Sequence, residues 1–186
     1  MRITFPTMLT ISRMAATPFI GWAIVAQSWT VAMWLLIYAA ITDVLDGYFA
    51  RLWQQESPLG TYLDPLADKL LLATCYAALV FFPAPSLEIP AWFLLVVLTK
   101  ETLLLAGAVY LGIMRQIVPI KPSIMGKLAM VVQSAFVVWL LACSVFCWTP
   151  FKTFYIFLIC ALLLVVGSFV QYGMAAWRKV RSGVYL

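Results

Sequence analysis

Six long apolar stretches constrain the fold of this chain more than any other feature of its sequence. Hydrophobic residues make up 65% of its 186 positions and charged residues 10%, against about 25% charged residues in typical soluble domains. A run of about 20 apolar residues is long enough to cross a bilayer as a helix. The expected spans are 8–26, 31–52, 60–82, 91–114, 124–147 and 151–177. The sequence therefore predicts an all-α integral membrane protein, a bundle of six transmembrane helices.

Turn and breaker residues separate the predicted helices. Gln27 and Ser28 divide the first pair, and Thr149 and Pro150 divide the last pair. The polar segment 54–58 lies in the second connection, and prolines cluster in the third and fourth connections. Because every connection is short and no internal repeat is visible, we expect residues 1–186 to form a single transmembrane domain.

The distribution of basic residues predicts the orientation in the membrane. With the N-terminus inside, the cytoplasmic segments hold Arg2, Arg13, Arg51, Arg115, Lys121, Lys127, Arg178, Lys179 and Arg181. The outer loops hold only Lys152. This asymmetry follows the positive-inside rule, so both termini are expected in the cytoplasm, with the bacterial inner (cell) membrane as the expected location. We attribute the net charge of +5 to orientation and to anionic lipid headgroups rather than to nucleic-acid binding.

An acidic cluster interrupts the second and third predicted helices. All four aspartates of the chain fall within 26 positions, and they are Asp43, Asp46, Asp64 and Asp68. An ionised carboxylate near the bilayer centre costs about 2.5–3.5 kcal/mol on insertion scales. Arg51 and Lys69 are the only bases in this stretch, so a bound divalent cation is the simplest counter-charge. The chain has no histidine, which excludes His-ligated zinc, haem and a Ser-His-Asp arrangement.

Helical spacing places the four aspartates on two faces, because residues three and four positions apart share a face. The faces contain Asp43, Asp46, Gly47 and Ala50 on one helix, and Gly60, Asp64 and Asp68 on the next. The short connection makes these helices antiparallel neighbours, so the two faces are expected to converge. Carboxylate ligands suit Mg²⁺ or Mn²⁺, and two such ions about 4 Å apart are used in phosphoryl transfer.

The neighbours of the aspartates point to a ligand. Gly47, Ala50 and Gly60 are small enough for a ligand to approach the backbone, and Arg51 is placed for a phosphate. The alternative from a different functional class is a divalent-cation or proton-coupled transporter with carboxylates at the membrane midplane. The absence of inverted halves and the confinement of the cluster to two adjacent helices count against a transporter.

The spacing from Asp43 to Asp68 reads D-x2-D-G-x2-A-R-x8-G-x3-D-x3-D without departure. It resembles the signature of the CDP-alcohol phosphatidyltransferase family. That resemblance implies a six-helix membrane homodimer that transfers a phosphatidyl group from CDP-diacylglycerol to an alcohol and releases CMP. It also implies a site at the cytoplasmic side that holds Mg²⁺ or Mn²⁺, with two ions expected.

The resemblance carries roles onto single residues. It implies that Asp43, Asp46, Asp64 and Asp68 are metal ligands and that Asp68 is also the general base. The residues expected to contact CDP-diacylglycerol are Thr10, Gly47, Ala50, Arg51, Ser57 and Gly60.

The N-terminal segment 6–13 also resembles this family, in particular its phosphatidylglycerophosphate synthases and cardiolipin synthases. Thr10 and Arg13 lie one helical turn apart and could face the nucleotide or a phosphate. The alternative is structural: Thr7 caps the helix and Arg13 extends its charged end to the membrane surface. Both interpretations are consistent with the sequence.

The acceptor elements resemble those of phosphatidylglycerophosphate synthases, so glycerol 3-phosphate is the first expected acceptor. The elements are Lys100-Glu101 and Gly126-Lys127 with Gln133. Lys100 replaces an arginine of that group, and Ala108, Ala129 and Met130 replace further Arg, Lys and Thr residues. These departures leave room for phosphatidylglycerol as the acceptor, as in a cardiolipin synthase. The candidate acceptor-binding residues are Arg13, Arg115, Lys121 and Lys127.

Lys100 and Glu101 allow other interpretations. Adjacent helical residues point about 100° apart, so the two side chains need not pair with each other. Extension of Lys100 to the outer surface, or its contact with another helix, competes with substrate binding.

Overall fold

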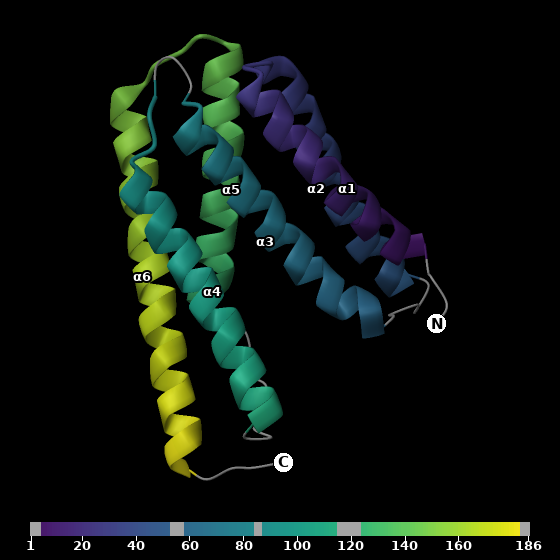
Figure 1. The fold of residues 1–186 in the computed structure, drawn as a ribbon, viewed down its shortest axis with the longest axis vertical. Coiled ribbons are helices and arrows are strands. Elements are labelled where there is room, and N and C mark those ends of the chain that lie inside the picture. The colour runs from purple at the N-terminus through teal and green to yellow at the C-terminus, as the bar shows by residue number, and fades with distance from the viewer. Residues whose placement is uncertain (1–4, 53–57, 84–86, 115–123, 183–186) are drawn as a thin grey trace. The chain divides into compact units, whose positions relative to one another are not determined.

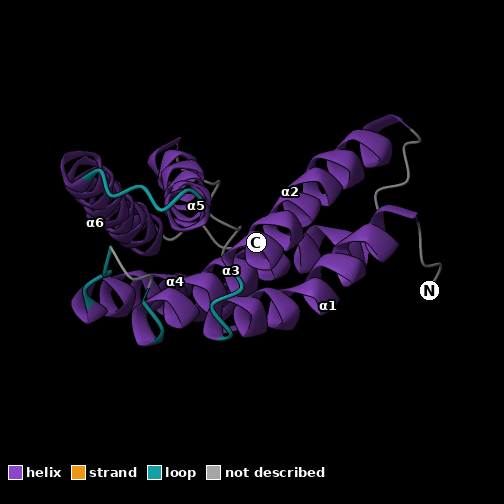
Figure 2. Ribbon diagram, turned by 90° about the horizontal axis from the view of Figure 1, so that it is seen from above, coloured by secondary structure: helices purple, strands orange, loops and turns teal. Residues whose placement is uncertain are grey.

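The computed structural model describes residues 5–52, 58–83, 87–114 and 124–182. These residues form six helices (Figure 1): α1 (Phe5–Val25), α2 (Trp29–Leu52), α3 (Pro58–Phe81), α4 (Ala91–Met114), α5 (Ile124–Val145) and α6 (Phe151–Ser182). Short loops join the helices in the described part of the chain (Figure 2). All six predicted helices are confirmed, and α6 continues beyond residue 177 to Ser182.

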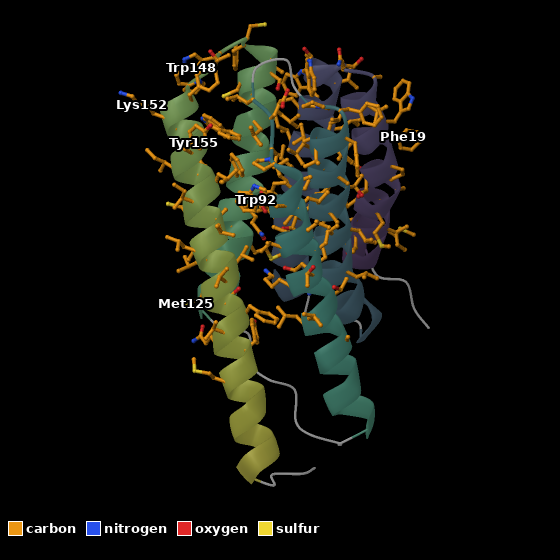
Figure 3. All side chains as sticks on the ribbon, turned by 60° about the vertical axis from the view of Figure 1, so that its left-hand side comes forward. Phe19, Trp92, Met125, Trp148, Lys152 and Tyr155 are labelled. Carbon is orange, nitrogen blue, oxygen red and sulfur yellow. The ribbon has the colours of Figure 1, made fainter. Side chains whose placement is uncertain are left out.

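The composition of the helices confirms a membrane protein. Within the described residues, three segments are long and apolar enough to cross a membrane: Met8–Val25, Met125–Val145 and Phe151–Met174. Large apolar side chains such as Phe19 on α1 and Tyr155 on α6 point outward and are exposed (Figure 3). Such a surface is stable against lipid tails and costly against water. The chain is therefore an integral membrane protein, while the full number of spans and the position of the termini stay predictions.

Left-handed residues end two of the helices. Gln27 (φ 53°) follows α1 and Cys147 (φ 51°) follows α5. After Gln27, the Ser28 amide donates to the Ala23 carbonyl at 2.9 Å, and the equivalent bond closes α5. This bond to the carbonyl five residues back is typical of the Schellman motif, which satisfies the last carbonyls of a helix. The turns predicted at 27–28 and 149–150 are thereby confirmed.

The helices fall into two compact units. The first unit holds α1, α2, α3 and the end of α5 from Val137, and the second holds α4, α5 up to Phe136, and α6. Within the first unit, α1 packs against both α2 and α3. Ala23 of α1, Ala39 of α2 and Ala67 of α3 are fully buried. Small residues at these positions let helix backbones approach closely, which is how helices associate in membranes.

Aromatic rings form the core of the second unit. Phe136 of α5 stacks on Phe157 of α6 with the ring centroids 5.7 Å apart. Phe93 of α4 meets the Phe136 ring edge-on, with the ring centroids 6.3 Å apart. Aromatic pairs in these geometries contribute about 0.5–1.5 kcal/mol each beyond their buried area. Phe136 therefore joins α4 and α6 to the first part of α5.

The contact between α1 and α3 provides a stability test at Gly21. A Cβ atom at Gly21 would lie 2.8 Å from Cγ2 of Thr74, so Thr74 must move or the helices must separate. We expect Gly21→Ala to cost about 1–3 kcal/mol through overpacking. Gly173→Ala on α6 is the matched control, because its Cβ would meet nothing within 4 Å. Both variants gain the same helix propensity, about 1 kcal/mol. Thermal unfolding in detergent should show a lower Tm for Gly21→Ala alone, and equal Tm values would contradict this packing.

Candidate functional site

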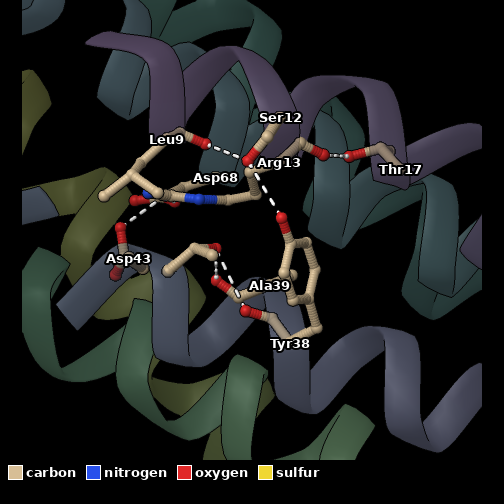
Figure 4. A network of polar contacts seen from close by, with 9 residues as sticks. Leu9, Ser12, Arg13, Thr17, Tyr38, Ala39, Asp43 and Asp68 are labelled. Atoms are coloured by element: carbon tan, nitrogen blue, oxygen red, sulfur yellow. Dashed lines mark hydrogen bonds and ion pairs between the residues drawn. The ribbon is translucent and has the colours of Figure 1, made fainter. Parts of the chain in front are cut away.

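A buried arginine lies at the centre of the candidate site. Arg13 projects from the middle of α1 and is 0% exposed. Its Nη1 atom donates to Oδ1 of Asp68 on α3 at 2.5 Å, and it also forms an ion pair with Oδ1 of Asp43 on α2. Figure 4 shows the guanidinium reaching from α1 toward both carboxylates. One side chain thus links the three helices of the first unit through charge.

The two carboxylates keep part of their surface open. The side chain of Asp43 is 47% exposed and that of Asp68 is 26% exposed, whereas Arg13 is fully enclosed. A buried ion pair tolerates the loss of water only when its geometry is good and its remaining polar atoms have partners. Because the carboxylates are partly accessible and the arginine is not, a ligand can approach this site from the carboxylate side.

Hydrogen bonds fix the helices around the ion pairs. The Thr17 hydroxyl donates to the Arg13 carbonyl at 3.0 Å, one turn along α1. The Tyr38 hydroxyl of α2 donates to Ser12 Oγ of α1 at 3.3 Å, so α1 and α2 are joined beside Arg13. Thr42, next to Asp43, is buried and donates to backbone carbonyls of its own helix at 2.9 and 3.0 Å. Of these bonds, the one from Tyr38 to Ser12 joins α1 to α2 beside the ion pair of Arg13 with Asp43 (Figure 4).

The structure corrects the sequence interpretation of Arg13. Its full burial shows that extension to the membrane surface is wrong. The proposed cap at Thr7 is also wrong, since α1 begins at Phe5 and Thr7 lies inside the helix. The bases within the stretch from Asp43 to Asp68 do not include Arg13, because this counter-charge comes from another helix.

A sequence signal for this partnership exists. Thr10, Arg13 and Thr17 are spaced by three and four residues on a mostly apolar helix, and all three are buried. A polar face on a membrane helix must meet polar partners inside the protein. The polar face of α1 therefore points to a buried charged partner on a neighbouring helix.

The structure describes the remaining predicted site residues to different extents. Asp46, Gly47, Ala50 and Arg51 lie on α2, and Gly60 and Asp64 lie on α3. The structure describes the helix backbone at these six positions and not their side chains. Ser57, Arg115 and Lys121 lie outside the described residues. Lys127 is exposed on α5 in the second unit.

Lys100 and Glu101 form a separate polar feature in the second unit. Lys100 is buried, and its Nζ lies 2.6 Å from Oε1 of Glu101. The two side chains therefore pair with each other, which their helical directions alone do not require. Lys100 also lines a pocket of about 310 Å³ between α4 and α6 whose other walls are mostly apolar. The lining residues are Leu95, Val96, Thr99, Lys100, Leu103, Val165, Val166 and Phe169.

The arrangement in the first unit fits a divalent cation. Oδ1 of Asp43 and Oδ1 of Asp68 both contact one nitrogen atom of Arg13. Two carboxylate oxygens from different helices thus lie beside the same cationic atom, and oxygen donors are the ligands that Mg²⁺ and Mn²⁺ prefer. Asp46 and Asp64 lie on the same two helices, one turn from Asp43 and Asp68 respectively.

Two animal proteins named as cardiolipin synthases are similar to part of this chain. A probable CMP-forming cardiolipin synthase from Drosophila melanogaster is 42% identical over 106 residues, which are 56% of this chain and 32% of that protein. The human CMP-forming cardiolipin synthase is 34% identical over 108 residues, 58% of this chain and 35% of that protein. The chain thus spans about a third of the length of these relatives.

A bacterial relative covers a larger share of both sequences. The CDP-diacylglycerol–glycerol-3-phosphate 3-phosphatidyltransferase of Aquifex aeolicus is 34% identical over 122 residues, which are 66% of each protein. The model of the CDP-alcohol phosphatidyltransferase family matches residues 3–178, a range that includes α1 and every position from Asp43 to Asp68. The chain therefore belongs to the CDP-alcohol phosphatidyltransferase family.

Proposed function

We propose that the chain transfers a phosphatidyl group from CDP-diacylglycerol to an alcohol acceptor and releases CMP. The convergence of Asp43 and Asp68 at Arg13 carries the proposal, because it brings the two ends of the aspartate signature together in one site. Membership of the family supports the same chemistry, and nothing in the matches supports a transporter. The site is proposed to face the cytoplasm in a homodimer of the bacterial inner membrane.

Asp68 is the proposed general base. The acceptor hydroxyl attacks the phosphatidyl phosphorus, the bond from that phosphorus to the CMP oxygen breaks, and the hydroxyl proton passes to Asp68. The side chain of Asp68 is 26% exposed, so an acceptor can reach it. Mg²⁺ or Mn²⁺, held by Asp43, Asp46, Asp64 and Asp68, would neutralise the diphosphate and stabilise the leaving group.

The donor is proposed to bind along the same two helices. Its contacts would be Thr10, Gly47, Ala50, Arg51, Ser57 and Gly60, as the family resemblance implies. Thr10 is buried one turn before Arg13 on α1, so it shares the buried face of that helix with Arg13 and does not face lipid. Its placement supports a role within the site.

Glycerol 3-phosphate is the acceptor that the sequence elements favour. It carries a phosphate, and its recognition requires cationic side chains. The proposed contacts to this phosphate are Arg115, Lys121 and Lys127. Of these, Lys127 lies on α5, and the other two lie outside the described residues. The similarity to the Aquifex aeolicus enzyme supports this acceptor.

Phosphatidylglycerol is the second candidate, and two observations favour it. Ala129 stands where the glycerol 3-phosphate enzymes have lysine, and Ala129 is fully buried, so that position offers no donor to a phosphate. Lys100 is already paired with Glu101. The similarity to two cardiolipin synthases points the same way, and a lipid acceptor needs fewer cationic contacts than glycerol 3-phosphate.

An acceptor screen separates the two possibilities. Purified protein is incubated with labelled CDP-diacylglycerol, Mg²⁺, and either glycerol 3-phosphate or phosphatidylglycerol. The product, phosphatidylglycerophosphate or cardiolipin, identifies the acceptor. We expect product from one acceptor to exceed product from the other by at least about tenfold, because a buried phosphate without its donors costs more than 1.4 kcal/mol. Equal turnover of both acceptors would contradict a selective acceptor site.

A further inference from the structure

Arg13 contacts carboxylate oxygens that the proposed metal ions would also bind. Its Nη1 contacts Oδ1 of Asp43 and Oδ1 of Asp68, so one nitrogen lies where oxygens from α2 and α3 converge. A cation that bridged the same two oxygens would need the same position. Two positive charges that share one carboxylate oxygen in a partly buried site repel each other strongly.

We propose that Arg13 is a resident counter-ion which a divalent cation displaces from Asp43 and Asp68. This inference rests on the proposed function, in which these carboxylates bind metal ions. Arg13 is then a positioning residue: it keeps the carboxylates of two helices together and it sets the affinity of the site for metal.

The burial of Arg13 makes this role specific. Because the side chain is 0% exposed, water does not replace its ion pairs, and the carboxylates provide its charge compensation. The Tyr38 hydroxyl of α2 donates to Ser12, the residue before Arg13 on α1. The backbone that carries Arg13 is therefore held in place, so the guanidinium is presented to the carboxylates before any metal arrives.

Removal of Arg13 should consequently have two opposite effects. Affinity for metal should rise, because the competing charge is gone. Stability without metal should fall, because Asp43 and Asp68 lose the positive charge that they share. A residue that only oriented the carboxylates for metal would change the affinity in the other direction, since its loss would weaken binding.

The test is the binding of Mn²⁺ to purified wild-type protein and to Arg13→Gln, measured by calorimetry after metal is removed with EDTA. We expect the Kd of Arg13→Gln to be at least about tenfold lower, with a larger rise of Tm on Mn²⁺ addition. Arg13→Lys keeps the charge and should return the Kd to within about threefold of wild type.

Two control variants separate charge competition from general damage. Thr17→Val removes the bond to the Arg13 backbone and leaves the guanidinium in place. Lys152→Gln removes one positive charge from an exposed position on α6. Both should bind Mn²⁺ with the wild-type Kd, within about twofold, as expected for changes outside the charged cluster.

The outcomes distinguish this inference from the proposed function. A Kd for Arg13→Gln that equals or exceeds that of wild type would overturn the displacement and leave metal binding intact. Absence of Mn²⁺ binding by wild type would overturn both. If Arg13→Gln does not fold, NMR of wild-type protein with ¹⁵N-labelled arginine replaces it. Mg²⁺ should then alter the guanidinium signal that is protected from solvent exchange in EDTA, and an unaltered signal would overturn the inference.

Discussion

Asp68→Asn is expected to lower the release of CMP from CDP-diacylglycerol by at least about 10²–10⁴-fold, the usual contribution of a general base. The amide cannot accept the acceptor's proton, and it is a weaker metal ligand than a carboxylate. The effect should appear in kcat at saturating donor and acceptor. It is measured as labelled CMP per protein molecule over time.

The fold of Asp68→Asn can be followed separately from its activity. Arg13 keeps its ion pair with Asp43 of α2, and α1 still packs against both α2 and α3, so the variant should unfold cooperatively. Glu88→Gln is the matched control, because Glu88 is an exposed acidic residue of the same unit. It should retain wild-type turnover. Near-normal CMP release by folded Asp68→Asn would refute the assignment of the base.

Chelation is expected to have an effect of similar size. EDTA should reduce CMP release to background, and excess Mg²⁺ or Mn²⁺ should restore it. Without a divalent cation the diphosphate of the donor meets partly exposed carboxylates, and like charges repel at this range. Because Arg13 pairs with Asp43 and Asp68 when no metal is bound, the loss of activity should be reversible and the protein should stay folded.

The chelation experiment has its own control. Ca²⁺ at equal concentration tests whether geometry matters, since Ca²⁺ prefers more ligands at longer distances than Mg²⁺. We expect Ca²⁺ to restore less activity than Mg²⁺. Turnover that persists in EDTA after dialysis would remove metal ions from the mechanism while leaving the family assignment untouched.

The helices could be predicted from sequence because their signals are local. Apolar runs of membrane length define them, and the breaks predicted at 27–28 and 149–150 lie between helices, beside turns closed by bonds between residues close in sequence. Convergence of Asp43 and Asp68 was also predicted, since spacing by three and four residues fixes which side chains share a helix face.

The role of Arg13 could not be obtained in the same way. It depends on the packing of α1 against both α2 and α3, and residues 13 and 68 are 55 positions apart. The pairing of Lys100 with Glu101 likewise depends on side-chain conformations that ideal helix directions do not determine. Both cases concern long flexible cations whose charged ends move several ångströms from the backbone.

Release of CMP from labelled CDP-diacylglycerol by purified wild-type protein tests the central claim most directly. With Mg²⁺ and an alcohol acceptor, we expect CMP and a phosphatidylated product to form in equal amounts. The aspartates are the proposed cause, so both products should disappear together in Asp68→Asn. The proposed phosphatidyl transfer would be contradicted if folded wild-type protein, supplied with Mg²⁺, released no CMP with either glycerol 3-phosphate or phosphatidylglycerol.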